Sequence, residues 1–308
     1  MKLRVLSNPT AGSGSAVRRL PHLKRLLADR GIIADFVETR APGDAARLVH
    51  EARADGVECL LVMGGDGTLN EVSQGYMDAQ GQPLPGPDLA LAPSGTGGDF
   101  RKTFGLGSTL EEAVERLSTA LPRPLDLGLL ELTAHSGEPI HRAFLNITSF
   151  GLGGLTDRLV NAGPKWIGGR AAFFVGSLRA LLSYQNAPVR VRVDGELCLE
   201  APIVNVALAN GQYFGGGMKI APNADPSDGL LEVVAMHDMT RAQGVLLAPR
   251  IYQGTHVDQP NVRVTRGSII AAESLVPRAE VLIDMDGETP GRLPLVARVA
   301  KGALRIRA

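Results

Sequence analysis

The chain has 308 residues, of which 44% are hydrophobic and only 4% aromatic, and its 32 acidic residues balance its 32 basic residues. This length predicts two domains with cores of Leu, Val, Ile and Ala, and the balanced charge gives no general attraction to nucleic acid. The two cysteines exclude a disulfide framework and a cysteine-rich metal cluster.

The N-terminal sequence predicts neither a signal peptide nor a membrane anchor. Its first apolar run, Leu3 to Leu6, contains Arg4 and ends at Asn8-Pro9, whereas a signal peptide needs an apolar core of roughly 7–15 residues. No uncharged apolar stretch approaches the ~20 residues of a membrane span. We therefore expect a cytoplasmic protein, and Cys59 fits that reducing compartment as a buried thiol.

The first part of the chain alternates short apolar runs with segments of helical periodicity. The expected strands are residues 3–6, 32–39, 59–63 and 89–92, and the expected helices are residues 15–29, 44–55, 68–77 and 109–121. Strands that alternate with helices over short connections are typical of a mainly parallel sheet flanked by helices. Residues 1–124 are therefore expected to form an α/β domain.

The pattern changes after Pro122-Arg123-Pro124, where short strand-like runs begin to dominate. Turn signals such as Asp194-Gly195 and Asp228-Gly229 separate these runs. The expected strands are residues 127–132, 143–148, 189–193, 203–209, 230–235, 261–265 and 281–284, and the expected helices are residues 164–184 and 240–254. Residues 125–295 are therefore expected to form a β-rich, sandwich-like domain.

The most informative local motif is the octet Gly64-Gly65-Asp66-Gly67-Thr68-Leu69-Asn70-Glu71, which joins an expected strand to an expected helix. Glycines let the backbone approach a ligand closely, and a helix N-terminus offers N–H groups and a positive dipole to a phosphate. Asp66 is placed to face Mg²⁺ or the transferring phosphoryl group. A plain turn rich in Gly and Asp is the alternative, but the position between strand and helix favours a phosphate site.

Two further loops of small residues follow other expected strands. Asn8–Gly14 follows the first strand, and Pro93–Phe100 follows the fourth. In a parallel sheet all three loops emerge at the carboxyl edge, where open α/β folds bind ligands. Either flanking loop alone is equally well explained as a turn, but the three together predict a nucleotide site.

Motifs of several other nucleotide-binding and hydrolytic classes are absent from the sequence. It lacks the Gly-x₄-Gly-Lys-Ser/Thr loop of P-loop enzymes, the Gly-x-Gly-x-x-Gly of Rossmann domains and the Gly-x-Ser-x-Gly of α/β-hydrolases. Its six histidines show no zinc-ligand spacing. The nucleotide-binding signal therefore rests on the three loops.

In their order along the chain, these loops resemble the catalytic domain of diacylglycerol kinases, especially the soluble bacterial lipid kinases, whose wider family includes sphingosine and ceramide kinases. Two C-terminal motifs, Asn223–Val233 and Ile283–Glu288, extend the resemblance over essentially the whole chain. The octet alone is less specific, since NAD kinases and phosphofructokinases carry similar loops. The resemblance implies an ATP- and Mg²⁺-dependent kinase that transfers the γ-phosphate to the hydroxyl of diacylglycerol or a similar lipid.

The resemblance also implies a fold and an active site. The first domain would be phosphofructokinase- and NAD-kinase-like, the final strand, about residues 296–308, would return to it, and the site would lie in the cleft between the domains. Asp286 and Glu288 match an Asp-Gly-Glu that supplies the candidate base, and Asp66 completes the expected catalytic residues. From the sequence alone, Asp286-Gly287-Glu288 is equally well explained as a turn with solvated acids. The expected nucleotide-binding residues are Asn8, Pro9, Thr10, Ala11, Gly12, Thr39, Gly65, Asp66, Gly67, Thr68, Leu69, Asn70, Glu71 and Thr96.

A metal site and one departure from the family pattern complete these expectations. Asp225 and Asp228, with the backbone carbonyl of Leu230, match a Mg²⁺ site, whose oxygen donors also suit Ca²⁺ or a structural ion. The family usually has Asn before the Asp of the third loop, whereas this chain has Gly98 before Asp99. The lost side-chain contact is expected to loosen the loop or alter the nucleotide preference.

The segment Pro164–Tyr184 holds the only Trp of the chain, and Lys165, Arg170 and Arg179 interrupt its apolar residues. It is expected either to pack on the β-rich domain or to form one wall of a lipid slot, with its cations near anionic headgroups. We therefore expect a lipid substrate, transient peripheral contact with the inner face of the membrane and no nucleic-acid partner. Monomer and homodimer both stay open.

Two alternatives remain from the sequence alone. One is an NAD kinase-like or other soluble-substrate kinase, against which the β-rich half and the Asp-Gly-Glu argue. The other is a catalytically silent nucleotide- or lipid-binding regulator, against which the retained Asp66, Asp286 and Glu288 argue. Diacylglycerol, monoacylglycerol, a sphingoid base and an undecaprenol-like alcohol all remain as phosphate acceptors.

Overall fold

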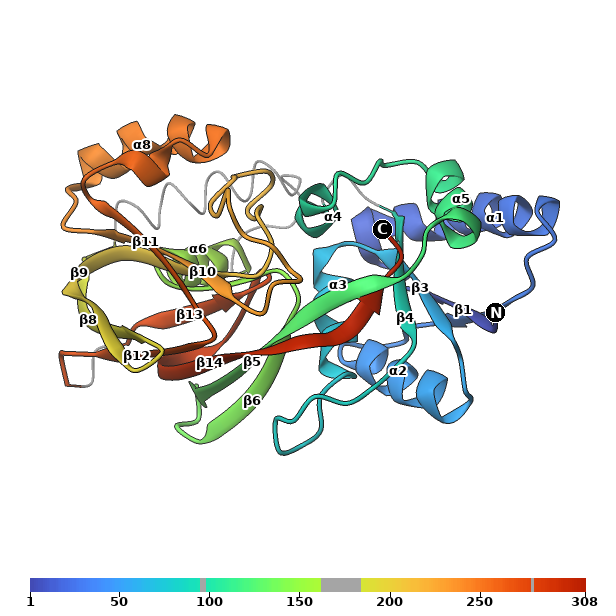
Figure 1. Cartoon of the computed structure of the whole chain (residues 1–308), viewed down its shortest axis with the longest axis horizontal. Helices are drawn as coiled ribbons and strands as arrows, with labels where there is room; N and C mark the ends of the chain where they lie inside the picture. The colour runs from blue at the N-terminus through green and yellow to red at the C-terminus, as the bar shows by residue number, and fades with distance from the viewer. Residues whose placement is uncertain (95–97, 162–183, 278–279) are drawn as a thin grey trace. The chain divides into compact units, whose positions relative to one another are not determined.

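The computed structural model describes residues 1–94, 98–161, 184–277 and 280–308 (Figure 1). The chain divides into two compact units, residues 1–127 with 300–308 and residues 128–299. Each unit has a hydrophobic core of its own. The first strand and the end of the last strand lie in the same unit.

The first unit is built on parallel strand pairs. Its strands, in spatial order, are β4 (Asp88–Pro93), β3 (Cys59–Gly64), β1 (Leu3–Ser7) and β2 (Ala34–Glu38). The long final strand β14 (Glu288–Ile306) adds Ile306, which pairs in parallel with Leu89 of β4. Strands β1, β3 and β4 are buried almost throughout, as their mainly apolar sequences predict. Burial raises the pKa of the Cys59 thiol to about 12, in agreement with its predicted interior position.

Helices cover this sheet on both faces. Helix α1 (Ala11–Asp29) and helix α5 (Leu110–Thr119) share one core cluster with the strands. Helix α2 (Asp44–Ala54) lies on the opposite face (Figure 1) and packs against α3 (Asp66–Gln74). A fifth helix, α4 (Asp99–Thr103), is short and follows the third loop.

The helix boundaries in the loops differ from the sequence prediction. The sequence predicts the first helix from Ser15, but α1 begins at Ala11, so the first loop ends at Thr10. It predicts the octet helix from Thr68, but α3 begins at Asp66. The first residues of α1 and α3 include Gly, Ser and Asp, which have low helix propensity and do not form an apolar repeat, so these helix starts could not be predicted. Helix α4, with five residues, is too short to show a helical repeat.

The second unit is β-rich, and its described strand pairings are antiparallel. Besides most of β14, its strands are β5 (Arg123–Ala134, which begins in the first unit), β6 (Pro139–Phe144), β7 (Ile147–Gly151), β8 (Ala187–Val193), β9 (Glu196–Ala209), β10 (Leu231–His237), β11 (Val262–Gly267), β12 (Ile269–Ser274) and β13 (Leu282–Met285). The pairings β7–β9–β8–β12–β14–β13–β7 form a closed circuit. Inward side chains from these strands make the core of the unit.

The second unit also contains helical segments. Those in the described residues are α6 (Leu152–Asn161), α8 (Arg241–Gln253) and the short 3₁₀ helix η2 (His256–Asp258). Helix α8 confirms the helix predicted at residues 240–254. The predicted segment Pro164–Tyr184 lies, apart from Tyr184, outside the described residues. Among the helices that are described, none has the length and apolarity needed to cross a membrane.

Candidate active-site residues

Asn8 ties the first loop to the octet. Its Nδ2 donates to Thr68 Oγ1 at 3.1 Å, and its Oδ1 accepts from the backbone N–H of Thr10 at 3.1 Å and from the Thr10 hydroxyl at 2.8 Å. Its own backbone N–H donates to the carbonyl of Met63, in β3, at 3.2 Å. The loops after β1 and β3 are therefore held side by side at one edge of the sheet.

The octet glycines fall into two kinds. At Gly64 a Cβ would lie 2.4 Å from Cβ of the buried Thr68, so α3 can turn back on β3 only because this side chain is missing. At Gly65 and Gly67 a Cβ would meet no described atom within 4 Å. Gly64 thus serves the fold, whereas Gly65 and Gly67 leave open space beside the start of α3.

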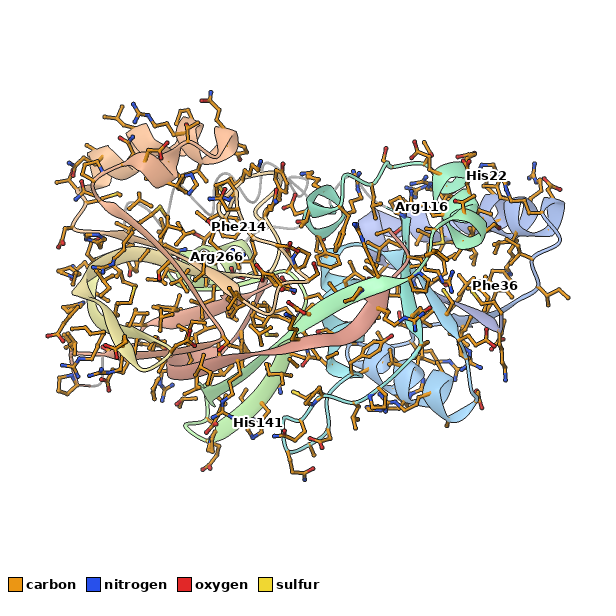
Figure 2. The ribbon with its side chains drawn as sticks, viewed as in Figure 1. His22, Phe36, Arg116, His141, Phe214 and Arg266 are labelled. Atoms are coloured by element: carbon orange, nitrogen blue, oxygen red, sulfur yellow. The ribbon has the colours of Figure 1, made fainter. Side chains whose placement is uncertain are left out.

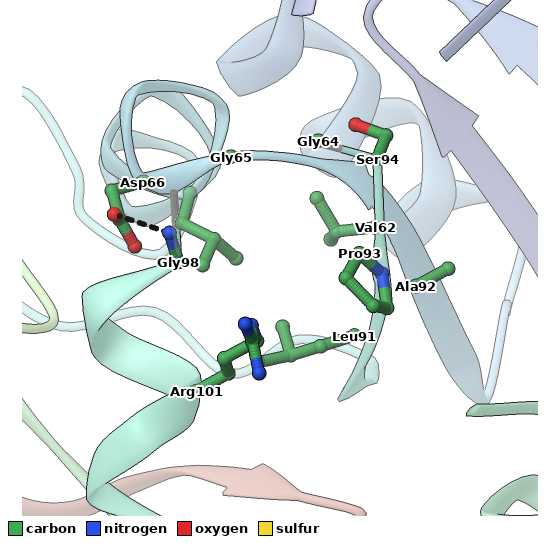
Figure 3. Close-up of a pocket in the computed structure, with 11 residues that line it drawn as sticks. Val62, Gly64, Gly65, Asp66, Leu91, Ala92, Pro93, Ser94, Gly98 and Arg101 are labelled. Atoms are coloured by element: carbon green, nitrogen blue, oxygen red, sulfur yellow. Dashed lines mark hydrogen bonds between the residues drawn. The ribbon is translucent and has the colours of Figure 1, made fainter. Parts of the chain in front are cut away.

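Asp66 joins the octet to the third loop. Its carboxylate accepts the backbone N–H of Gly98 at 3.1 Å (Figure 3) and those of Asp99 at 2.9 Å and Phe100 at 3.3 Å. Burial raises the pKa of Asp66, and these three donors act in the opposite direction. The carboxylate that the sequence places toward a metal or a phosphoryl group is therefore engaged with the backbone of α4.

A pocket opens where β3 and β4 end (Figure 3). The lining residues are Val62, Gly64, Gly65, Asp66, Leu69, Leu91, Ala92, Pro93, Ser94, Gly98 and Arg101. Gly98 has φ +108°, and a Cβ there would lie 2.8 Å from Arg101 Nε. Arg101 Nη1 donates to the Leu106 carbonyl at 2.9 Å, while Nε is buried without a partner among the described residues. Arg101 thus fills the space beside the residue where the family usually has Asn.

The remaining predicted nucleotide-binding residues lie at several places in the first unit. Glu71 Oε2 accepts the N–H of Gly43 at 3.0 Å, at the start of α2, and the N–H of Thr39 donates to the Ser7 carbonyl at 3.0 Å. Asn70 is buried inside α3. Pro9 lies in the first loop, Ala11 and Gly12 open α1 and Leu69 lines the pocket. Thr96 lies outside the described residues.

In the second unit, Asp286-Gly287 is the two-residue turn between β13 and β14. Both residues have positive φ, 50° and 92°, and Met285 pairs with Glu288 across the turn, as in a type I′ hairpin. Asp286 Oδ1 accepts the N–H of Ile147 at 3.0 Å, and the Asp286 N–H donates to the Ile147 carbonyl at 3.1 Å. The turn is therefore pinned to β7, and Glu288 follows it as an exposed residue.

A buried polar cluster behind this turn is absent from the sequence prediction. Asp284 accepts the Ser149 hydroxyl at 3.1 Å and the N–H of Gly287 at 3.0 Å. Asn205 Oδ1 accepts the N–H of Gly153 at 2.9 Å, and a Cβ at Gly153 would lie 2.4 Å from Ser149 Oγ. The available signal was the spacing of Asp284 two residues before Asp286, since alternate residues share one face of a strand.

Both carboxylates of the predicted metal loop already interact with other groups of the protein. Asp225 Oδ1 accepts the N–H of Ser227 at 3.0 Å and its hydroxyl at 2.6 Å. Asp228 Oδ1 accepts the N–H of Leu230 at 2.9 Å, and Asp228 Oδ2 forms an ion pair with Arg266 of β11. Figure 2 labels Arg266. Within the described ranges, no group of three or more His, Cys, Asp and Glu side chains could hold a metal ion.

Glu232 lies two residues beyond this loop and is fully buried in β10. Burial raises the pKa of Glu232, whereas the positive charge of Arg266 and hydrogen bonding with Asn223 act in the opposite direction. Arg266 therefore faces two acids, and sequence reasoning missed this cation because it lies far along the chain.

Comparison with protein families finds a match over each part of the chain. Residues 2–130 match the diacylglycerol kinase catalytic domain, and residues 146–308 match the YegS C-terminal NAD kinase beta sandwich-like domain. The first match contains the three loops. The second contains the metal loop and the Asp-Gly-Glu turn.

Whole proteins with the same arrangement are also similar to this chain. A protein of Mycobacterium tuberculosis named diacylglycerol kinase is 29% identical over 306 residues, which cover 99% of this chain and 94% of the relative. A probable lipid kinase YegS-like of Xanthomonas euvesicatoria is 31% identical and covers 85% and 82%. A crystal structure of a putative diacylglycerol kinase from Bacillus anthracis has a TM-score of 0.75 at 24% identity over 99% and 96% of the two chains. This last likeness is one of fold.

Proposed function

This chain belongs to the lipid kinase family that joins a diacylglycerol kinase catalytic domain to a YegS-type C-terminal domain, and we propose that it transfers the γ-phosphate of ATP to the hydroxyl of diacylglycerol or a similar lipid. One observation carries this proposal. The Asn8–Thr68 and Asp66–Gly98 hydrogen bonds join the loops that follow β1, β3 and β4 at one sheet edge. Such an edge is where open α/β folds bind ligands.

The nucleotide would bind with its phosphates beside the start of α3. Gly65 and Gly67 leave room for close approach of an anion, and the N–H groups of the first helical turn have no partners within the helix. Arg101 adds a positive charge to the pocket lining, with its Nε buried and unpartnered among the described residues. Asp66 would hold the third loop in the geometry that this site requires.

The residues of the metal loop fit Mg²⁺ in their chemistry. Asp225 and Asp228 bring carboxylates and Leu230 brings a carbonyl, which are the hard oxygen donors that this ion prefers. The ion pair of Asp228 with Arg266 indicates that the loop attracts positive charge. Mg²⁺ bound there would neutralise negative charge on the loop.

The acid turn would supply the base. Transfer forms a bond between the lipid hydroxyl oxygen and the γ-phosphorus, breaks the bond to the β-phosphate bridging oxygen, and releases the hydroxyl proton. Glu288 is exposed at the end of the turn, so it can accept that proton, while Asp286 holds the turn on β7 through Ile147. The reaction would take place at the inner face of the membrane, where such lipids are found.

A lipid-panel assay tests this function. The purified chain is incubated with γ-labelled ATP, Mg²⁺ and separate acceptors: diacylglycerol, monoacylglycerol, a sphingoid base, a polyprenol and NAD, with mass-spectrometric identification of products. We expect label in a lipid phosphate and none in NADP. Labelled NADP with unlabelled lipids would make the chain a soluble-substrate kinase, and no transfer to any acceptor would favour a silent regulator.

A further inference from the structure

Helix α8 exposes a large apolar surface on one side. Its inner side is anchored by the buried Leu247 and by the partly buried Ile251, which pack on a core cluster of the second unit. On its outer side Val245 is 52% exposed, Leu246 75% and Tyr252 54%. Every other described helix or strand has at most one exposed large hydrophobic residue.

The exposed residues share one face of the helix. At about 100° per residue, Val245, Leu246 and Tyr252 fall within a sector of roughly 120°. Ala242, Pro249 and the polar Gln253 lie between them in this sector. The helix stands at the periphery of the second unit in Figure 1. A capping box of Thr240 with Gln243 begins it and Gly254, in the left-handed conformation, ends it, so the helix is well defined without any cover on this face.

The helix itself carries positive but no negative side chains. Residues 241–253 contain Arg241 and Arg250 and no carboxylate, whereas Asp238 and Asp258 lie before and after the helix. Arg250 lies in the last turn and is exposed. An exposed apolar face with an arginine beside it, on a helix without acids, is typical of a helix that lies in the interface of an anionic membrane.

We propose that α8 docks this protein onto an anionic phospholipid bilayer, with Val245, Leu246 and Tyr252 inserted at the headgroup boundary and Arg250 near lipid phosphates. This inference rests on the proposed function, because a diacylglycerol-like acceptor is dissolved in a bilayer and an enzyme acting on it must reach that surface. Contact with anionic lipid offsets the exposure of these apolar side chains to water.

Vesicle sedimentation without nucleotide tests the docking surface. The full-length chain is mixed with vesicles of equal parts phosphatidylcholine and phosphatidylglycerol, and with vesicles of phosphatidylcholine alone. The double variant Val245→Ser/Leu246→Ser is expected to lower the partition coefficient at least tenfold, because each apolar side chain contributes through its buried area. Arg250→Gln is expected to weaken binding about fivefold on anionic vesicles only.

A matched control removes apolar residues elsewhere. Ile33→Ser/Leu197→Ser changes two exposed apolar side chains outside α8, 90% and 52% exposed, and is expected to bind vesicles like the unaltered chain. Both double variants are expected to phosphorylate dihexanoylglycerol, kept below its micellar concentration, at the unaltered rate. Thermal unfolding confirms that each variant is folded.

The outcomes separate the two proposals. Unchanged vesicle binding by Val245→Ser/Leu246→Ser would overturn the proposed docking surface. If this variant binds vesicles normally but light scattering shows that it has lost a homodimer formed by the unaltered chain, the α8 face contacts a second copy of the chain instead. Failure of the unaltered chain to phosphorylate lipid in any form would instead overturn the proposed function. Lost vesicle binding by the variant, with normal transfer to dihexanoylglycerol, is the result we expect.

Discussion

Single residues in the first unit act by joining loops rather than by adding core. Asn8 donates through Nδ2 to Thr68 of the octet, and Asp66 accepts backbone N–H groups of the third loop through its carboxylate. The sequence identifies both residues correctly as members of the loops. From the sequence, Asp66 is expected to face a ligand. A carboxylate in a glycine-rich loop does not indicate that it will accept a backbone N–H from a residue 33 positions later.

Asp66→Ala is predicted to reduce ATP binding as well as turnover. It removes the acceptor for three backbone N–H groups, and loss of hydrogen bonds to a charged group costs about 2–3 kcal/mol. Limited proteolysis near residue 98, thermal unfolding and nucleotide titration measure the effect. Glu71→Ala is the control, because it removes the acceptor of one N–H and should cost less. A variant with wild-type unfolding and ATP affinity would contradict this role.

Arg101→Gln is predicted to raise the KM for ATP about tenfold, which corresponds to ~1.4 kcal/mol of lost binding. The guanidinium lies in the pocket with Nε unpartnered among the described residues, so its loss should affect a phosphate ligand more than the fold. Steady-state kinetics with varied ATP provide the measurement. Lys102→Gln is the control, since Lys102 pairs with Asp99 at 2.6 Å. Equal KM values for Arg101→Gln and the unaltered chain would exclude the contact.

His256 is predicted to make stability depend on pH. Burial lowers the pKa of His256 below its ordinary 6.5, against a bond from Nε2–H to the Ile220 carbonyl at 3.0 Å. The unfolded chain therefore binds the proton more readily, so this contribution is complete above pH 6.5 and is lost as the pH falls through and below that value.

Urea unfolding between pH 5 and 8 measures this dependence. His256→Gln keeps a donor toward Ile220 but does not titrate, so its stability should fall less than that of the unaltered chain as the pH decreases. His141→Gln, at a partly exposed strand position, should follow the unaltered chain. Parallel pH profiles for His256→Gln and the unaltered chain would contradict the assignment.

Whole elements were predicted with uneven success, for physical reasons. Helix α8 could be predicted because helical residues lie between a capping Thr240 and a stop at Gly254. Only the second part of strand β14 was expected, as the final strand at about residues 296–308. Its first part was not, because Pro290, Gly291 and Pro294 resemble turn signals within it. The predicted strand at 143–148 is instead the end of β6 and the start of β7.

The contact of β11 with the metal loop leads to a prediction at this scale. Arg266 pairs with Asp228 and also faces Glu232, so it competes with a cation for the same negative charge. Arg266→Gln is expected to raise the affinity of the loop for Mg²⁺ about tenfold, although it lowers stability without the ion by about 1–2 kcal/mol.

Thermal unfolding in a Mg²⁺ titration tests this competition. Arg266→Gln should show a larger rise in unfolding temperature with Mg²⁺ than the unaltered chain, and Asp228→Ala should show a smaller one. Arg190→Gln, which breaks an exposed ion pair with Glu200 and Glu273 in the same unit, should leave the Mg²⁺ effect unchanged. An equal Mg²⁺ effect in Arg266→Gln and the unaltered chain would exclude the competition.

At the scale of the whole molecule, the family could be predicted from the sequence through the order of its motifs. The three loops and the two C-terminal motifs lie within the matched family regions, and the β-rich second unit was expected from its short runs and turns. The polar cluster of Asp284, Ser149 and Asn205 was not, because strands distant in sequence bring it together. Arg266 escaped prediction for the same reason.

We propose that Glu288 accepts the proton of the lipid hydroxyl during phosphate transfer from ATP. Glu288→Gln keeps the size and hydrogen bonding of the side chain and removes its basicity. General-base help is worth about 10²–10⁴-fold, so the rate should fall by that factor with ATP affinity almost unchanged. Asp286→Asn should also be impaired, since Asp286 holds the turn on Ile147.

Single-turnover transfer from γ-labelled ATP to diacylglycerol, paired with nucleotide titration on the same preparations, tests this claim most directly. We predict that Glu288→Gln binds ATP like the unaltered chain and transfers phosphate about 10²–10⁴-fold more slowly. Normal transfer by Glu288→Gln while Asp286→Asn is inactive would move the base to Asp286, and normal transfer by both variants would contradict the account.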